Sequence, residues 1–280
     1  MVILRIEYLC RAEKWMMKRF EKDIPSTNGQ LMDFARNLHQ KGEPLPDLYT
    51  LYTDYQSRGR GAGSNKWHSS RGLNILASIL FDTGLAASDQ FVFNLWFSTA
   101  TRAFLSRYLP DVLIKWPNDM YVHDRKLAGD LTEHSVSGGR LDYTVAGIGI
   151  NVNEKDFPTD IPHPTSLLTE TGRHHDIDTL MDEYLSILQE RRPQLHLDCA
   201  TALHDEYLEH LYRYNEKHPY IIGGQTLDCI IRDIDRFGRL LLEHPDGTLH
   251  AHDFKQVTYT FPIHNSQFTT HNSQFIIHNS

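Results

Sequence analysis

The stretches Lys115-Trp116-Pro117-Asn118-Asp119 and Lys126-Leu127-Ala128-Gly129, which begins seven residues after Asp119, carry the most information in this 280-residue chain. The first combines a cation, a large aromatic ring, a proline, an amide and a carboxylate, without the alternation of polar and apolar residues that a half-buried strand shows. Pro117 has no N–H to donate, so it belongs at the edge or the end of a strand. We therefore expect its polar neighbours to be presented to a ligand rather than buried.

The surrounding sequence predicts a unit that mixes helices and strands. Ser26 or Thr27 is suited to cap a helix that begins there. Runs rich in β-branched and aromatic residues, bounded by glycine and proline, predict strands, and residues 56–67 predict a glycine-rich loop. The predicted helices cover residues 27–38, 91–108, 178–195 and 200–213, and the predicted strands cover residues 48–55, 73–81, 112–116, 126–134 and 141–151.

The two ends of the chain differ from this unit. Residues 1–19 form an N-terminal extension, which is either an extra helix or an overlong start. In residues 262–280 the sequence His-Asn-Ser-Gln-Phe occurs twice and begins a third time, which is typical of a disordered low-complexity tail. Between Pro219 and this tail, short strand-like runs separated by glycine turns predict a small β module. Its strands are expected at residues 220–222, 225–233, 239–243 and 248–252.

Composition and charge exclude several classes of protein. Hydrophobic residues make up 40% and charged residues 23% of the chain, which fits a folded globular protein. The 36 acidic and 28 basic residues give a net charge of −8, which argues against binding to nucleic acid, because such binding depends on neutralising phosphates. Basic residues nonetheless gather locally, and we expect a site for a small anionic ligand near them. They are Arg58, Arg60, Lys66 and Arg71, and further on Lys115, Arg125 and Lys126.

The cysteines and the apolar runs bear on the compartment. Cys10, Cys199 and Cys229 are an odd number, lie far apart and form no C-x-x-C pair. This pattern suits a reducing compartment and argues against both a disulfide framework and a zinc site. No apolar run is long enough to span a membrane, and the N-terminus has no secretion signal. We therefore expect a cytoplasmic protein that makes no contact with a membrane.

Three further segments point to ligand binding. Ser26-Thr27-Asn28 stands at a helix start, where backbone N–H groups are free, although such a sequence alone is usually only a cap. The glycines of residues 56–67 allow a loop to close over a ligand, but the loop matches neither a P-loop nor a dinucleotide-binding fingerprint. In residues 147–153 glycines alternate with isoleucines on a strand, which leaves a groove that a flat ligand could occupy.

Taken in order, these motifs resemble those of biotin–protein ligases, from about residue 20 to residue 261. That family reads Ser-Thr-Asn, Gln-x-x-Gly-Arg-Gly, Trp, Lys-Trp-Pro-Asn-Asp, Lys-x-x-Gly and Gly-x-Gly-x-Asn, and all of these occur here at compatible spacing. The resemblance implies an α+β fold. It predicts a class II aminoacyl-tRNA synthetase-like mixed sheet flanked by helices over residues 20–219, which holds biotin and ATP, and an SH3-like β-barrel over residues 220–261.

The resemblance also implies an activity. The enzyme would activate biotin with ATP and Mg²⁺ to biotinyl-5′-AMP. It would then transfer biotin to a lysine of the biotin carboxyl carrier domain of a biotin-dependent carboxylase. We expect a monomer or a homodimer that binds no nucleic acid.

Roles for individual residues follow from the same resemblance. Asp119 would position either Mg²⁺ or the acceptor lysine, and Trp67 would lie near the adenine. Catalysis would involve Lys126, Lys115, Asp119 and Arg60. Biotin would contact Ser26, Thr27, Asn28, Gln56, Gly59, Arg60, Gly61, Ala62, Lys126 and Gly129. ATP or the adenylate would contact Arg58, Asn65, Trp67, Lys115, Asn118, Gly149 and Asn151.

Two places depart from the family pattern. Many relatives carry a further basic residue right after Gly-Arg-Gly, where this chain has Ala62 and Gly63, and Arg58 stands where a small residue is usual. We hypothesise that Arg58 partly substitutes and that the adenylate is held more loosely, since a charge-assisted hydrogen bond contributes roughly 1.5–3 kcal/mol. Asp130 replaces a usually aliphatic residue, and a carboxylate there has to face solvent or pair with a nearby arginine.

Three other functions compete with this interpretation of the sequence. A lipoate or octanoate ligase of the same superfamily is the nearest, although Trp116, Gln56 and the Gly-Arg-Gly loop favour biotin. A biotin-sensing repressor would need a winged-helix domain ahead of Ser26, and the 25 residues there are too few for one. A non-catalytic biotin-binding protein, with its loop altered at Ala62, is the third.

Overall fold

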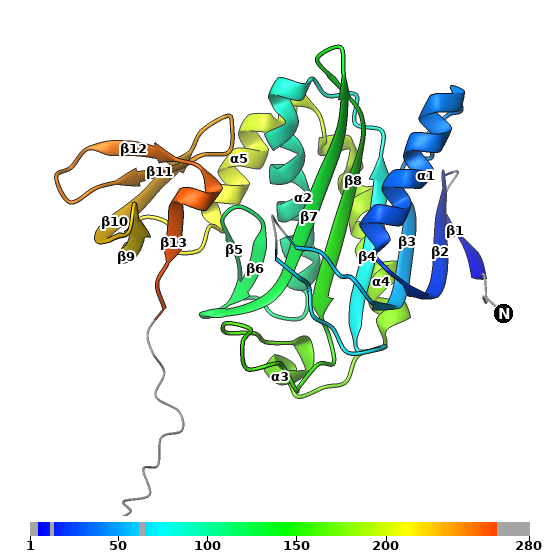
Figure 1. Ribbon diagram of the computed structural model, residues 1–280, viewed down its shortest axis with the longest axis horizontal. Helices are drawn as coiled ribbons and strands as arrows, with labels where there is room; N and C mark the ends of the chain where they lie inside the picture. Colours follow the sequence, from blue (N-terminus) through cyan, green and yellow to red (C-terminus); the bar gives the residue numbers. More distant parts are fainter. Residues whose placement is uncertain (1–4, 12–13, 62–64, 262–280) are drawn as a thin grey trace, which may run out of the picture.

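A long mixed sheet forms the centre of the molecule. The computed structural model describes residues 5–11, 14–61 and 65–261 (Figure 1). The strand order is β1-β2-β3-β4-β8-β7-β6-β5, in which β2 and β3 run parallel and the other neighbours antiparallel. The strands are β1 (Arg5–Arg11), β2 (Lys14–Ile24), β3 (Tyr49–Gln56), β4 (Asn74–Phe81), β5 (Val112–Lys115), β6 (Asp119–Val122), β7 (Arg125–Ser137) and β8 (Arg140–Asn151).

Helices cover both faces of this sheet (Figure 1). Helix α1 packs Leu31 and Ala35 on Leu80, while α2, α4 and α5 cover the opposite face, where Ile79 and Phe81 lie. Ser26 caps α1 by accepting a hydrogen bond from the Gly29 N–H. No described helix is long and apolar enough to cross a membrane. The helices are α1 (Thr27–Lys41), α2 (Gln90–Leu105), α3 (Leu167–Thr171), α4 (Ile177–Arg191) and α5 (Ala200–Glu209), with 3₁₀ turns at Ala87–Asp89, Arg192–Gln194, Leu197–Cys199 and Phe254–Gln256.

A second, antiparallel sheet of five strands lies beside the β5–β6 end of the first (Figure 1). Its buried residues Tyr220, Ile231 and Leu240 belong to the same hydrophobic cluster as the main core. The Trp116 indole N–H also donates to the Gly238 carbonyl at 2.9 Å, so the two sheets share one interior. The strand order is β12-β11-β10-β9-β13, with β9 (Lys217–Ile222), β10 (Gln225–Ile234), β11 (Leu240–Glu243), β12 (Leu249–His252) and β13 (Val257–Tyr259).

The structure corrects several element predictions. The prediction of an extra helix in residues 1–19 is wrong, because β1 and β2 form an antiparallel pair there. Strand β2 continues to Ile24 because its C-terminal half pairs with β3. The predicted boundary at residue 20 therefore falls inside a strand. The last two helices of the predicted larger unit end earlier than expected, at Arg191 and Glu209. Strands β6 and β13 and helix α3 were not predicted, and the tail at residues 262–280 lies outside the described residues.

Candidate active site

A cavity on the α1 side of the sheet brings together most of the residues singled out by sequence. It is bounded by the start of α1, the end of β3, the glycine-rich loop, and the facing strands β6, β7 and β8. Segments that are far apart in the chain therefore meet at one place. The predicted residues that line it are Ser26, Thr27, Asn28, Gln56, Arg60, Gly61, Asn65, Trp67, Asn118, Asp119, Lys126, Gly129 and Gly149.

Hydrogen bonds join the start of α1 to the end of β3. The Gln56 side-chain oxygen accepts from the Thr27 backbone N–H at 2.8 Å and from its hydroxyl at 3.2 Å. The Ser78 hydroxyl oxygen of β4 lies 2.7 Å from the Thr27 hydroxyl oxygen. Because these bonds occupy one of the free N–H groups of the helix start, they fix the backbone that forms this end of the cavity.

The Asn28 side chain is fully engaged by protein groups. Its NH₂ donates to the Leu131 carbonyl and to Glu133, both at 2.9 Å, and its oxygen accepts from Ser78 at 2.5 Å. A side-chain amide has two N–H groups and one oxygen, so little bonding capacity is left for a ligand. A Cβ at Gly147 would collide with this amide. The geometry therefore makes Asn28 a fixed part of the cavity wall.

Lys126 and Asp119 form the charged centre of the cavity. The Lys126 ammonium lies 2.7 Å from the Asp119 carboxylate and 5.6 Å from the centre of the Trp67 ring. Strand β6 places Asp119 opposite Gly129 of β7, and an irregularity in the register follows between Met120 and Tyr121. A Cβ on Gly129 would lie 2.8 Å from the carboxylate and 3.0 Å from the ammonium, so only glycine leaves room for the pair.

Trp67 occupies the groove that glycine creates in β8. Its indole lies where a Cβ on Gly149 would be, and its ring N–H is buried without a hydrogen-bond partner among the described residues. The groove predicted for a flat ligand thus holds a flat side chain of the protein in this structure. The backbone N–H of Trp67 donates to the Gly59 carbonyl at 3.1 Å and so joins the two described ends of the glycine-rich loop.

Lys115 points away from the cavity. Its ammonium lies 4.4 Å from the Tyr259 ring centre and 5.3 Å from that of Tyr121, within cation–π range. Burial lowers the pKa of Lys115, against an opposing effect of Asp119. Since Tyr259 belongs to β13, this lysine contacts the second sheet, and its predicted contact with phosphate stays a prediction.

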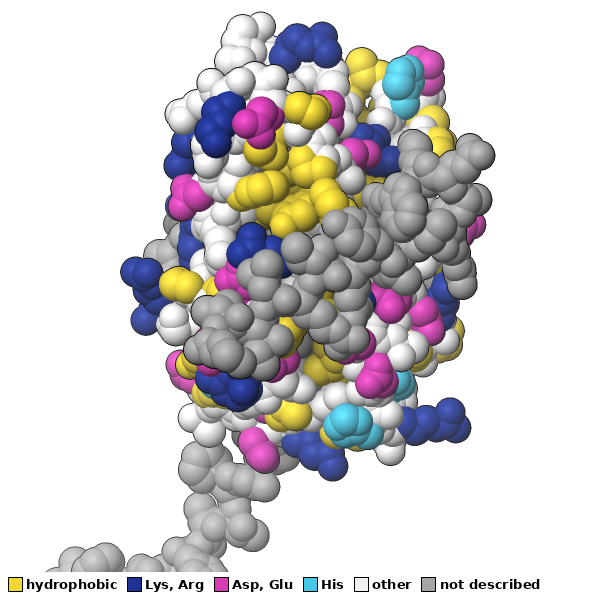
Figure 2. Space-filling model, turned by 90° about the vertical axis from the view of Figure 1, so that its right-hand side faces the viewer, with side chains coloured by type: hydrophobic (Ala, Val, Ile, Leu, Met, Phe, Trp, Pro, Cys, Tyr) yellow, Lys and Arg dark blue, Asp and Glu magenta, His cyan; other side chains and the backbone are white. Residues whose placement is uncertain are grey.

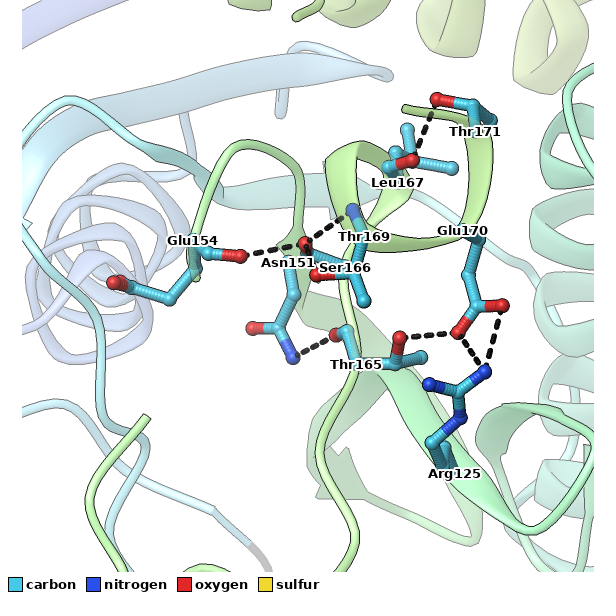
Figure 3. A network of polar contacts seen from close by, with 9 residues as sticks. All are labelled: Arg125, Asn151, Glu154, Thr165, Ser166, Leu167, Thr169, Glu170 and Thr171. Atoms are coloured by element: carbon cyan, nitrogen blue, oxygen red, sulfur yellow. Dashed lines mark hydrogen bonds and ion pairs between the residues drawn. The ribbon is translucent and has the colours of Figure 1, made fainter. Parts of the chain in front are cut away.

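Asn151 lies beyond the cavity lining and holds a loop. Its NH₂ donates to the Thr165 carbonyl at 2.9 Å (Figure 3). The Thr165 N–H in turn donates to the Lys126 carbonyl at 2.9 Å. Arg125, next to Lys126, pairs with Glu170 of α3 at 2.8 Å (Figure 3). Asn151 therefore acts on the cavity through the backbone of Lys126.

Asp130 contradicts both expectations for it. It is only 8% exposed, and its partner is the Asn118 amide, which donates to it, rather than solvent or an arginine. Burial, reinforced by the charge of Asp119, raises the pKa of Asp130 well above its usual range. The residue is tolerated in the interior because it is hydrogen-bonded and is held close to its neutral form.

The remaining predicted residues lie outside the cavity lining. Arg58 is exposed and Gly59 is buried in the loop hairpin, while Ala62 and Gly63 lie outside the described residues. The substitution of Arg58 for the missing cation thus gains no support from its position. Phe254, in the 3₁₀ turn between β12 and β13, lines the cavity and was not predicted, because nothing in its local sequence distinguishes it from other module residues. Sequence reasoning also missed Ser78 and Glu133.

Comparisons with known proteins identify the family. The family model described as biotin/lipoate A/B protein ligase matches residues 24–151. The chain is 32% identical to the bifunctional ligase/repressor BirA of Escherichia coli over 232 residues, which cover 81% of this chain and 68% of that protein. It is 27% identical to the biotin–[acetyl-CoA-carboxylase] ligase of Mycobacterium tuberculosis, covering 86% and 88% of the two chains.

A solved structure shows the same fold. It is biotin protein ligase from Aquifex aeolicus in complex with biotin and ATP, with a TM-score of 0.65 and 22% identity over 86% of this chain and 97% of that one. The mixed sheet with helices on both faces is thus the fold of that protein. Together with the relatives above, this likeness defines the class: the chain belongs to the biotin/lipoate A/B protein ligase family.

Proposed function

We propose that this protein is a biotin–protein ligase, which forms biotinyl-5′-AMP from biotin and ATP and transfers biotin to a carrier lysine. The observation that carries the proposal is the convergence of Thr27, Gln56, Arg60 and Lys126 on one cavity. The relatives named above include a biotin–[acetyl-CoA-carboxylase] ligase. A cavity that holds an acid and an activated nucleotide needs a cation at its centre, which Lys126 supplies.

In the first step, a biotin carboxylate oxygen attacks the α-phosphorus of ATP, and pyrophosphate leaves. Lys126 offsets the negative charge that accumulates between the two anions, and preorganised charge of this kind is often the largest contribution to catalysis. The Lys126 ammonium is already held by Asp119 at 2.7 Å, so it needs little reorganisation. Arg60 and the loop N–H groups would bind the phosphate from the other side.

In the second step, the amine of the carrier lysine attacks the biotinyl carbonyl and AMP leaves. Asp119 faces the cavity and can accept a hydrogen bond from that amine, which orients its lone pair. Trp67 and the glycine-rich loop would keep water away from the mixed anhydride. Phe254 lies at the rim and is 43% exposed, so an incoming carrier domain would meet the second sheet there.

The donors present do not build a magnesium site by themselves. Among the described residues no three carboxylates, histidines or cysteines surround a common point, and Asp119 is already paired with Lys126. Mg²⁺ usually binds through one or two carboxylates together with substrate phosphates. We therefore expect Mg²⁺ to arrive with ATP, and Asp119 as its ligand stays a prediction.

The architecture and partners form part of the proposal. We assign the eight-stranded sheet and its helices to a class II synthetase-like catalytic unit, and the five-stranded sheet to an SH3-like barrel. On the face shown in Figure 2, acidic and basic side chains are interspersed rather than gathered by sign. With the net charge of −8, this supports a protein carrier domain rather than nucleic acid as the partner. A cytoplasmic location and a monomeric or dimeric state stay predictions.

The test is direct. Purified protein is incubated with ATP and Mg²⁺ and with biotin, lipoate or octanoate, and the acyl-adenylate is measured by mass spectrometry. We expect biotinyl-AMP alone. Lys126→Met should lower its rate of formation by at least ~100-fold, because one charge that stabilises the transition state contributes about 3 kcal/mol. Lys217→Met, an exposed lysine of β9, serves as the matched control. An adenylate of lipoate in place of biotin would reject the proposal.

A further inference from the structure

Glu133 of β7 is a charged side chain at the edge of the site that the mechanism above does not use. One of its carboxylate oxygens accepts from the Asn28 amide at 2.9 Å. The carboxylate also receives two hydrogen bonds from the Arg60 guanidinium, at 2.9 and 3.3 Å. One carboxylate thus joins the helix that begins at the cavity to the loop that lies over it.

The Asn28 end of this link is rigid. Asn28 is 3% exposed, its three polar groups are bonded to Ser78, Leu131 and Glu133, and it fits against the bare backbone of Gly147. A buried and fully satisfied amide has a single arrangement, because each alternative leaves a polar group without a partner. The Asn28 amide therefore holds the Glu133 carboxylate in one position.

The Arg60 end belongs to a loop. Its hairpin is closed by the Gly61 N–H, which donates to the Asn65 carbonyl at 2.8 Å, and by Trp67, which donates to Gly59. Gly59 and Gly61 cannot be replaced by larger residues without contact with Trp67 and Asn65. These backbone bonds join the two described ends of the loop, and the Arg60 ion pair adds a side-chain contact that links the loop to β7.

We propose that Glu133 is a positioning residue, which holds the Arg60 side chain at the cavity before the substrates bind. This inference rests on the proposed function. An arginine side chain that is already in place loses less conformational entropy when the ligand arrives, and binding is correspondingly tighter. Glu133 touches neither substrate; it acts on both through Arg60.

The expected effects are modest, since the Arg60 side chain is 51% and that of Glu133 26% exposed. Glu133→Gln keeps an oxygen for Asn28 but removes the charge that Arg60 pairs with. We expect the KM for biotin and the dissociation rate of biotinyl-AMP to rise roughly 3- to 10-fold, with kcat at saturating substrates nearly unchanged. Glu133→Ala, which also frees the Asn28 amide, should cost more and lower the melting temperature as well.

A double-mutant cycle decides between positioning and a merely structural role. Biotinyl-AMP dissociation is measured for wild type, Glu133→Gln, Arg60→Gln and the double variant. If Glu133 acts through Arg60, the change at residue 133 has no further effect once Arg60 is gone. Equal effects in both backgrounds, or wild-type kinetics for Glu133→Gln, would overturn the inference. Glu243→Gln, which breaks a matched Arg–Glu pair in the second sheet, is the control.

These experiments distinguish failure of the Glu133 proposal from failure of the proposed function. Biotin binding is measured by calorimetry for each variant, independently of turnover. If the wild-type protein forms no biotinyl-AMP, the proposed function fails whatever Glu133 does. If it forms the adenylate and Glu133→Gln retains it as well as wild type does, only the positioning role is rejected.

Discussion

At the scale of single residues, Asp130 shows how the interior changes the chemistry of a side chain. Its carboxyl group is nearly inaccessible, and the Asn118 amide is its hydrogen-bond donor. Because Asn118 and Asp119 are adjacent, the buried carboxyl group fixes the backbone that presents the charged centre of the cavity. A residue that departs from the family pattern thus has a clear structural contact.

The protonation of Asp130 predicts how stability depends on pH. Its pKa is raised in the folded protein, so the folded state keeps a proton that the unfolded chain releases above its ordinary carboxyl pKa. The free energy of unfolding therefore falls as the pH rises through the interval up to the raised pKa. Asp130→Asn should remove this fall and be more stable than wild type at pH 8 by about 1–3 kcal/mol, while the two proteins differ little near pH 4.

Urea unfolding at pH values from 4 to 8 measures this difference. Asp178→Asn, a substitution of an exposed carboxylate at the start of α4, is the control and should follow the wild-type curve. Parallel curves for Asp130→Asn and wild type would show that Asp130 is ionised in the folded state.

At the scale of elements, strand β8 explains why the site needs glycine. On its cavity face Gly147 makes room for the Asn28 amide and Gly149 for the Trp67 indole. On its opposite face Ile148 and Ile150 pack into the main core. Successive residues of a strand point to opposite faces of the sheet. One face of β8 therefore packs into the core, and the other face lines the cavity.

Gly149→Ala tests this arrangement. The added Cβ overlaps the indole of Trp67, and overpacking of this kind typically costs about 1–3 kcal/mol. We expect a lower melting temperature, a shift in tryptophan fluorescence and a higher KM for ATP. Gly29→Ala in α1 is the matched control, because its Cβ would lie 3.8 Å from the nearest atom and alanine favours a helix. Unchanged fluorescence in Gly149→Ala would place Trp67 elsewhere.

At the scale of the whole molecule, the two sheets behave as one body. Trp116 is 2% exposed and lies between them. Its indole N–H donates a hydrogen bond to the Gly238 carbonyl, and its ring packs edge-on against Phe254, with 5.8 Å between the ring centroids. Lys115, next to Trp116, lies beneath Tyr259. The motif that marks the active site by sequence is therefore also the joint between the sheets, which explains why so large an aromatic ring stands within it.

This joint predicts a single cooperative unfolding transition. Trp116→Phe removes one hydrogen bond and should lower the free energy of unfolding by about 1 kcal/mol, and the melting temperature by about 2–4 °C. Circular dichroism and tryptophan fluorescence should report the same midpoint. Phe237→Leu, at a position that is 56% exposed, should leave it unchanged. Two separate transitions in the wild-type protein would show that the sheets unfold independently.

The cores of the elements could be predicted, and their ends and their partners could not. The helix from Thr27 and the strands β3, β4, β7 and β8 follow from local pattern and lie within a few residues of their predicted bounds. Strand β2 was not predicted, because the alternation of polar and apolar residues in its sequence is too weak to identify a strand without the pairing with β3. Strand β6 has four residues, too few for a period to be recognised, yet it brings Asp119 to Lys126.

What the sequence determined by itself is the set of candidate site residues, because the conformational freedom of glycine, the charge of lysine and the amide of glutamine belong to the residue types themselves. Which of them face the cavity was decided only by tertiary structure. Lys115 contacts the ring of Tyr259, which lies 144 residues further along the chain. The Asn28 amide makes all of its hydrogen bonds to other protein groups. Direction and bonding depend on long-range packing, and that information lies in no single motif.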